Sequence, residues 1–168
     1  MPVANQNESR SQTSLSITRT FDAPPARVFD AWLDPAQMEK WMGPRDKVAR
    51  AEILELDARV GGRYRIRMHI KDGPQPIVGG VYREITRPTR LVFTWAWEPE
   101  AGYCGDGADQ ASRPQDDPML VTVTFRAVGD RTEMTLLHEK LASEEDRAGH
   151  EHGWIGSVEQ LAAFLRSA

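Results

Sequence analysis

Residues 143–168 read SEEDRAGHEHGWIGSVEQLAAFLRSA, and this stretch has the features of one long helix. Ser143 can cap the first free backbone amides, and the three acids that follow it suit the positive end of the helix dipole. Apolar residues then recur at intervals of three and four, at Trp154, Val158, Leu161 and Leu165. This spacing gives the helix an apolar face. Because such a face needs a partner, we expect the rest of the chain to pack against it.

Three glycines, Gly149, Gly153 and Gly156, lie inside this predicted helix. Each destabilises a helix interior by roughly 1 kcal/mol relative to alanine. Packing, and not intrinsic propensity, must therefore hold the helix in place. Gly153 and Gly156 flank Trp154, which indicates either a close approach to another backbone or a helix that bends or begins late, near His150.

Composition and length predict one domain and exclude some classes of partner. A chain of 168 residues can build a sizeable single core. The net charge is −4 and no run of lysine or arginine is long enough to follow a phosphate backbone, so we expect no nucleic-acid partner. The single cysteine, Cys104, excludes an internal disulfide and is compatible with a reducing compartment.

The first fourteen residues of the sequence are mostly polar. Residues 1–14 have no apolar core of a signal peptide, and no apolar run approaches the ~20 residues of a membrane span. We therefore expect a cytoplasmic protein without a membrane span. Residues 1–14 are predicted to form a disordered polar leader, and residues 15–168 a single domain.

Ahead of the long helix, most of the chain alternates between apolar and polar residues with a period of two. This alternation predicts seven strands, near residues 15–21, 48–56, 63–70, 77–85, 91–97, 121–125 and 134–138. Two short helices are expected between the first two strands, with a stop at Gly43-Pro44. Short connections between neighbouring strands indicate antiparallel pairing. The predicted fold class is therefore α+β, a seven-stranded antiparallel sheet that needs the C-terminal helix as its cover.

Residues 98–118 interrupt this pattern. They are rich in glycine, aspartate and proline, and at about 21 residues they exceed the ~12 to 15 residues of an ordinary connection. We expect a mobile hairpin loop here, and its role stays open.

Several short motifs, each present once, follow one another along the chain. They are Ala26–Trp32 with Asp34-Pro35, Trp41 with Gly43-Pro44, Val60–Tyr64, Gly80–Ile85, Arg90–Trp95, Val121–Phe125, Thr135–His138 and Gly153-Trp154. In order and spacing they resemble the helix-grip fold of the START-like (SRPBCC) superfamily, which includes birch-pollen-allergen-like and polyketide cyclase-like proteins. Within it, the chain resembles the bacterial family related to the C-terminal domain of the activator of heat-shock protein 90 ATPase. The resemblance implies a cavity between sheet and long helix, used in different members for lipids, sterols, hormones or polyketides.

A set of mostly aromatic residues is expected to line this cavity: Trp41, Tyr64, Met68, Phe93, Trp95, Trp97, Trp154 and, on the same helical face, Val158. Small-molecule pockets are mostly apolar and aromatic with a few polar anchors, which suits the set. The alternative is that these rings simply fill the core, where each buries roughly 150 to 250 Å².

Polar anchors for a ligand are expected on the strand near residues 79–85. In one register Tyr82 and Glu84 point inward, and in the other Arg83 does, because a slip by one residue exchanges the two faces of a strand. The resemblance favours Tyr82 and Glu84. An inward Glu84 would need a hydrogen-bond partner or a raised pKa. The alternative is a solvated glutamate that pairs across strands with an arginine such as Arg65.

Histidines and arginines supply further candidates. His138 continues the phase of the strand near residues 134–138, so it either enters the cavity or is a satisfied core histidine. His150 and His152 are two apart on a helix and face different directions, so we expect no metal site. No dinucleotide or phosphate-loop motif is present, so no cofactor is expected. Arg63, Arg65 and Arg67 form a basic stripe, which is a solvated face or a docking site for an acidic partner.

Three functions follow from these observations. The first is non-enzymatic binding of a small hydrophobic molecule in the cavity between the sheet and the C-terminal helix. The second is a co-chaperone-like stimulation of a heat-shock protein 90 ATPase, with a chaperone as partner. The third is a cyclase- or hydrolase-type enzyme with Glu84 or His138 as general acid or base. It ranks last because no paired carboxylates, triad or metal set emerges. We expect a monomer or a homodimer.

Overall fold

The computed structural model describes residues 14–98 and 118–167 of the chain. The expected leader, apart from Ser14, and residues 99–117 of the expected loop lie outside the described residues, as does Cys104. The elements follow in the predicted order: β1 (Leu15–Phe21), α2 (Pro25–Ala31), α3 (Pro35–Trp41), β2 (Val48–Leu56), β3 (Arg63–Ile70), β4 (Ile77–Thr86), β5 (Arg90–Trp97), β6 (Met119–Val128), β7 (Arg131–Glu139) and α5 (Glu144–Ser167).

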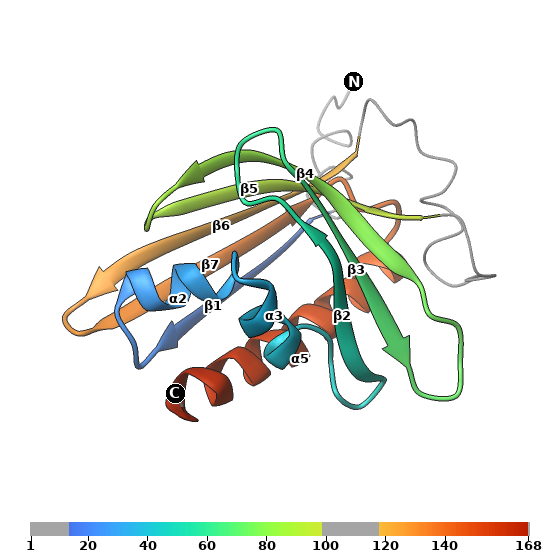
Figure 1. Ribbon diagram of the computed structural model, residues 1–168, viewed down its shortest axis with the longest axis horizontal. Coiled ribbons are helices and arrows are strands. Elements are labelled where there is room, and N and C mark those ends of the chain that lie inside the picture. The colour runs from blue at the N-terminus through green and yellow to red at the C-terminus, as the bar shows by residue number, and fades with distance from the viewer. Residues whose placement is uncertain (1–13, 99–117, 168) are drawn as a thin grey trace, which may run out of the picture.

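The seven strands form one sheet in the order β1-β7-β6-β5-β4-β3-β2, and every neighbouring pair is antiparallel. Figure 1 shows this sheet curled over α5. Helices α2 and α3, which connect β1 to β2 in the chain, lie beside α5. The tight turns arise where the sequence supplies turn residues. Val128 pairs with Arg131 across the two-residue turn at Gly129, whose φ of +61° suits glycine. The predicted α+β helix-grip architecture is therefore confirmed.

Helix α5 runs without interruption from Glu144 to Ser167, which excludes a late start near His150. Two side-chain hydrogen bonds cap the first turn of α5. The Ser143 hydroxyl accepts from the Asp146 amide at 3.1 Å, and the Asp146 carboxylate accepts from the Ala142 amide at 3.1 Å. This reciprocal arrangement satisfies amides that a helix start leaves free.

The apolar face of α5 contacts the concave side of the molecule as expected. Its buried positions include Trp154, Val158, Leu161 and Leu165. Helix α5 contacts α3 and β1. Within the described residues, none of the helices has the length and apolar character needed to cross a membrane.

The two glycines beside Trp154 differ in what surrounds them. A Cβ built on Gly156 would lie 2.5 Å from the Cβ and 2.8 Å from the Cα of Pro44, so α5 touches the segment after α3 at this point. Two hydrogen bonds flank the contact: the Gly43 amide donates to Ser157 Oγ at 2.8 Å, and Gln160 Nε2 donates to the Gly43 carbonyl at 3.0 Å. A Cβ on Gly153 would meet no atom within 4 Å. The close-approach interpretation therefore holds for Gly156 alone.

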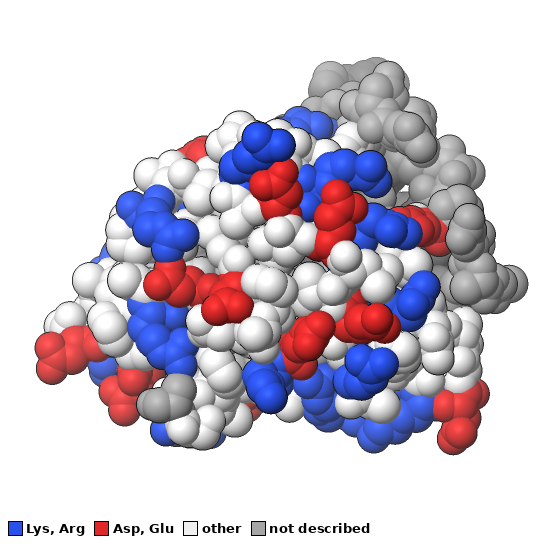
Figure 2. Space-filling model, in the orientation of Figure 1, with Lys and Arg blue, Asp and Glu red and all other residues white. Residues whose placement is uncertain are grey.

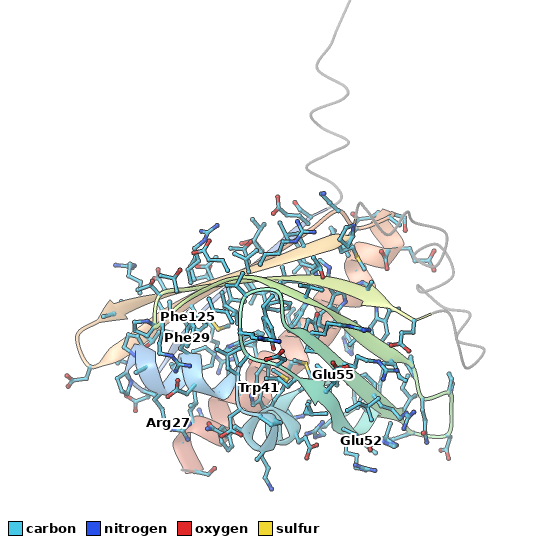
Figure 3. All side chains as sticks on the ribbon, turned by 45° about the horizontal axis from the view of Figure 1, so that its top comes forward. Arg27, Phe29, Trp41, Glu52, Glu55 and Phe125 are labelled. Atoms are coloured by element: carbon cyan, nitrogen blue, oxygen red, sulfur yellow. The ribbon has the colours of Figure 1, made fainter. Side chains whose placement is uncertain are left out.

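Helices α2 and α3 form a packed corner at one end of α5. The rings of Trp32 and Trp41 meet edge to face at 4.7 Å, and Trp41 Nε1 donates to the Ala31 carbonyl at 3.0 Å. Phe29 of α2 and Phe125 of β6 lie beside one another, with ring centroids 5.2 Å apart (Figure 3). The segment that follows this corner, from Met42 to Val48, provides one side of the pocket described next.

Candidate functional site

A pocket of about 140 Å³ opens between the first half of α5, the ends of β3 and β5, and the segment after α3. We call it the helix pocket. Its wall is mostly apolar, and its principal lining residues are Met42, Met68, Trp95, Trp97, His150 and Trp154. Gly153 also lies in the wall, and a Cβ built on it would meet no atom within 4 Å.

Four of the residues expected to line a cavity do line this one: Met68, Trp95, Trp97 and Trp154. The ring centroids of Trp95 and Trp154 are 4.9 Å apart, although the two residues come from β5 and α5. Trp97 stands nearly perpendicular to Trp95, at 6.0 Å and 89°. Three indoles thus provide the aromatic part of the wall.

The other expected aromatic residues fill the core. Tyr64, Tyr82 and Phe93 border a separate gap of about 10 Å³, which has room for about one water molecule at most. Their ring centroids are 5.5 to 6.2 Å apart. Trp41 and Val158 are buried and line neither space. The sequence allowed two interpretations, a cavity or a filled core. Each therefore applies to a different part of the interior.

The expectation that Glu84 points inward is wrong. Tyr82 is buried, but the Glu84 side chain lies on the outer face, 41% exposed, where its carboxylate pairs with Arg90 at 3.1 Å. The register between β4 and β5 shifts between Tyr82 and Glu84. Beyond this shift Ile85, and not Glu84, pairs with the buried Leu91. A bulge of this kind changes the phase of a strand, and simple alternation does not reveal it.

His138 is fully buried, and one of its ring nitrogens is hydrogen-bonded to Trp154. Its Nδ1 accepts a hydrogen bond from Trp154 Nε1 at 3.0 Å. Because an indole nitrogen only donates, Nδ1 of His138 carries no proton in this bond. His138 is not among the residues that line the helix pocket. It therefore supports the pocket indirectly, by orienting an indole of the wall.

His150 is a residue of the pocket wall that the sequence analysis does not single out. Its side chain is 6% exposed and lines the pocket. Nε2 accepts from Trp97 Nε1 at 3.1 Å, and Nδ1 lies 2.9 Å from the Asp146 carbonyl and 3.2 Å from its carboxylate. The ring proton therefore sits on Nδ1, where Asp146 orients it, and Nε2 is an acceptor. The signal was present, since aspartate and histidine four apart share one face of a helix.

His152 also lines the helix pocket, but its side chain bonds a different partner from that of His150. Its Nε2 lies 2.8 Å from an oxygen of Asp46, and both side chains are about half exposed. This hydrogen bond holds the pKa of the Asp46 carboxyl below its usual value. In the part of the chain that the structure describes, no three histidine, cysteine, aspartate or glutamate residues are grouped so that they could hold a metal.

Tyr64 and Tyr82 allow a prediction about alkaline pH. Burial raises the pKa of both phenols, and for Tyr64 the neighbouring Tyr82 adds to the effect. In the unfolded chain tyrosine ionises near pH ~10. An acid that stays protonated in the fold but ionises when unfolded stabilises the fold below that pH and destabilises it above. We expect the free energy of unfolding to fall as the pH rises beyond about 10.

The measurement is absorbance at 295 nm during an alkaline titration, with circular dichroism recorded in parallel. Ionisation of these two tyrosines should coincide with loss of structure. Tyr82→Phe, which keeps the ring, should weaken the dependence of stability on pH. Ionisation of both phenols near pH ~10 in a protein that stays folded would contradict the burial described here.

The expected basic stripe on β3 is largely compensated by acids. Arg65 pairs with Glu98 at 2.7 Å, and Arg67 lies 3.8 Å from Glu52. Figure 2 shows acidic and basic side chains interspersed over the face that it displays. No strongly basic patch is therefore apparent on that face.

Comparisons with known proteins are consistent with this geometry. The family model described as "Activator of Hsp90 ATPase homolog 1-like protein" matches residues 22–166. A crystal structure of a Chromobacterium violaceum protein is 28% identical, with a TM-score of 0.75, and the match covers 90% of this chain and 95% of that one. A solution structure of an Arthrobacter aurescens protein is 28% identical, with a TM-score of 0.74, and the match covers 94% of this chain and 88% of that one. The crystal structure of an AHSA1 protein from Silicibacter pomeroyi is 26% identical, with a TM-score of 0.68, and the match covers 91% of this chain and 97% of that one. No curated protein matches the sequence.

Proposed function

The chain belongs to the family of Activator of Hsp90 ATPase homolog 1-like proteins, and we propose that it binds a small hydrophobic molecule in the helix pocket. The observation that carries this proposal is the pocket itself, about 140 Å³ with a mostly apolar wall. Protein interiors are packed like organic crystals, and a void lined by apolar groups destabilises the fold. A hollow of this size between otherwise packed elements therefore suggests a ligand.

The wall has the composition of a ligand site. Met68, Trp95 and Trp154 supply apolar surface, and His150 supplies an oriented polar group. Pockets for small molecules combine apolar and aromatic walls with a few polar groups of this kind. Lys47 adds an exposed cation at the mouth.

The proposal is one of binding without catalysis. Glu84, a candidate general acid or base, lies on the outer face of the sheet, paired with Arg90. His138, the other candidate, is held by Trp154 outside the pocket wall. A general base must come within hydrogen-bond reach of the proton that it abstracts, and neither residue offers this to a molecule in the pocket.

Gly153→Leu is the variant that tests the proposal. The glycine lies in the pocket wall and a Cβ there meets no atom within 4 Å, so a leucine side chain would extend into the hollow without a clash at its base. We expect this variant to weaken ligand binding at least about tenfold, equivalent to 1.4 kcal/mol. Its stability should stay the same or rise, because leucine favours a helix more than glycine does.

Two measurements check this expectation. Native mass spectrometry of the purified protein detects a co-purified ligand, and quenching of tryptophan emission by a panel of small lipids and aromatic compounds gives affinities. Ile155→Leu is the matched control, because Ile155 lies on the same helix with 48% exposure. Wild-type protein that neither carries nor binds any compound would refute the proposal, as would a Gly153→Leu variant with unchanged affinities.

A second candidate function comes from the name of the family, which refers to activation of the Hsp90 ATPase. Under this alternative the protein stimulates a chaperone ATPase through its surface, whose charges are mixed (Figure 2). An ATPase assay with the cognate chaperone tests it. Stimulation that persists in Gly153→Leu would favour the surface function, and unchanged turnover at saturating protein would exclude it.

A further inference from the structure

The volume of the helix pocket limits the size of what it can hold. An engineered cavity of about 150 Å³ in another protein takes up one benzene molecule. At about 140 Å³, the helix pocket has room to enclose a single six-membered ring and too little to enclose a sterol or an acyl chain. This step rests on the function proposed above and narrows it.

The wall favours a flat, aromatic ring. Trp95, Trp97 and Trp154 present indole surfaces, and Met42 and Met68 present thioethers. Aromatic rings attract one another in offset and edge-to-face arrangements at centroid distances of about 4.5 to 7 Å. Methionine sulfur also packs well against rings.

The pocket wall contains an oriented hydrogen-bond acceptor on an aromatic ring, His150 Nε2. Asp146 holds the proton of the ring on Nδ1, at 2.9 Å from its carbonyl and 3.2 Å from its carboxylate. Nε2 now accepts the N–H of Trp97 at 3.1 Å. His150 Nε2 therefore already accepts a hydrogen bond from a flat aromatic ring, the indole of Trp97. Trp97 is only partly buried, so water can bond its N–H if another donor replaces it.

The pocket wall also contains a residue with an unsatisfied donor, Trp95. Its Nε1 is buried and has no hydrogen-bond partner among residues 14–98 and 118–167. A buried donor without an acceptor destabilises a protein, so an acceptor that reaches it is favoured. The ring centroids of Trp95 and His150 are 6.5 Å apart, and both residues line the helix pocket.

We propose that the helix pocket binds a phenol, a single aromatic ring with a hydroxyl group. The hydroxyl donates to His150 Nε2 in place of Trp97 and accepts from Trp95 Nε1, because a hydroxyl is both a donor and an acceptor. The ring lies among the three indoles. No bond is made or broken in this step, and His150 is a binding residue.

The test compares p-cresol with toluene, which has the same ring and methyl group but no hydroxyl. Titrations followed by ¹H–¹⁵N spectra give both dissociation constants and report on the indole N–H signals, which single Trp→Phe variants assign. In the wild-type protein p-cresol should move the Trp95 and Trp97 indole signals more than toluene does. The quantity to follow is the ratio of the toluene Kd to the p-cresol Kd.

Two variants should change this ratio in opposite directions. His150→Phe removes the acceptor and should lower the ratio about three- to tenfold, the range expected for one hydrogen bond. Trp97→Phe removes the competing donor and should raise it. Ile155→Leu is the control and should leave the ratio unchanged, because Ile155 is 48% exposed on the same helix and does not line the pocket.

The possible outcomes separate this inference from the function on which it rests. If neither p-cresol nor toluene nor any compound of the larger panel binds, both are refuted. If compounds bind but His150→Phe and Trp97→Phe leave the ratio unchanged, the pocket is a ligand site and the phenol assignment is wrong. Should His150→Phe fail to fold, an increase of the ratio in Trp97→Phe supports the assignment, and its absence overturns it.

Discussion

Trp154→Ala is expected to lower the free energy of unfolding by about 3–5 kcal/mol, the range for truncating a large buried side chain. Trp154 is 3% exposed, and its ring lies 4.9 Å from Trp95 and 5.9 Å from Trp32. Alanine would merge the helix pocket with the space left by the indole, so ligand affinity should fall as well. Urea denaturation followed by circular dichroism measures the effect without relying on tryptophan emission.

Trp154→Phe separates packing from hydrogen bonding at this position. It keeps a ring but removes the N–H that His138 Nδ1 accepts at 3.0 Å inside the core. Leaving a buried acceptor without its donor destabilises a protein by about 1–3 kcal/mol. A double-mutant cycle with His138→Leu should show a coupling of at least about 0.5 kcal/mol. A loss in Trp154→Ala no larger than that of an exposed control would mean that α5 does not pack on the sheet as described.

Gly156→Val is expected to destabilise the protein by about 3 kcal/mol, the upper part of the range for overpacking a core. Even the first side-chain atom would lie 2.5 Å from Pro44 Cβ and 2.8 Å from its Cα. The proline ring cannot rotate away, so α5 must move outward. Such a shift would strain the nearby hydrogen bond from the Gly43 amide to Ser157 Oγ. Thermal or urea unfolding measures the loss.

Gly153→Ala is the matched control on the same helix. A Cβ at this position meets nothing within 4 Å, so the gain in helix propensity should raise stability by up to about 1 kcal/mol. The two substitutions are therefore expected to differ in sign. If both stabilise the protein, α5 and Pro44 are not in contact. If both destabilise it, the space beside Gly153 is already filled.

Much of the fold could be predicted because its signals are local. Strand alternation, the helix stop at Gly43-Pro44 and the cap at Ser143 each depend on a few neighbouring residues, and all are confirmed. The two glycines around Trp154 show the limit of such signals. Both are unfavourable in a helix by the same amount, yet only Gly156 has a tertiary reason, the contact with Pro44.

The candidate site was less predictable than the fold. Alternation places Tyr82 and Glu84 on one face of a strand, but the register shift between them sends Glu84 to the surface. Whether a strand bulges depends on its pairing partner, which the strand's own sequence does not specify. The two-residue spacing of His150 and His152 argues only against a metal site. The role of His150 depends on Asp146 and Trp97, which the folded chain brings to its two nitrogens.

Local pattern was thus sufficient for the elements, their order and their antiparallel pairing, since periodicity and turn chemistry act between near neighbours. Which indoles surround a hollow and which fill the core was decided only when the chain folded. Trp97 and His150 are 53 residues apart in sequence, and a hydrogen bond of 3.1 Å joins them. Distances between such residues follow from the curl of the sheet and the packing of α5, and no local signal encodes them.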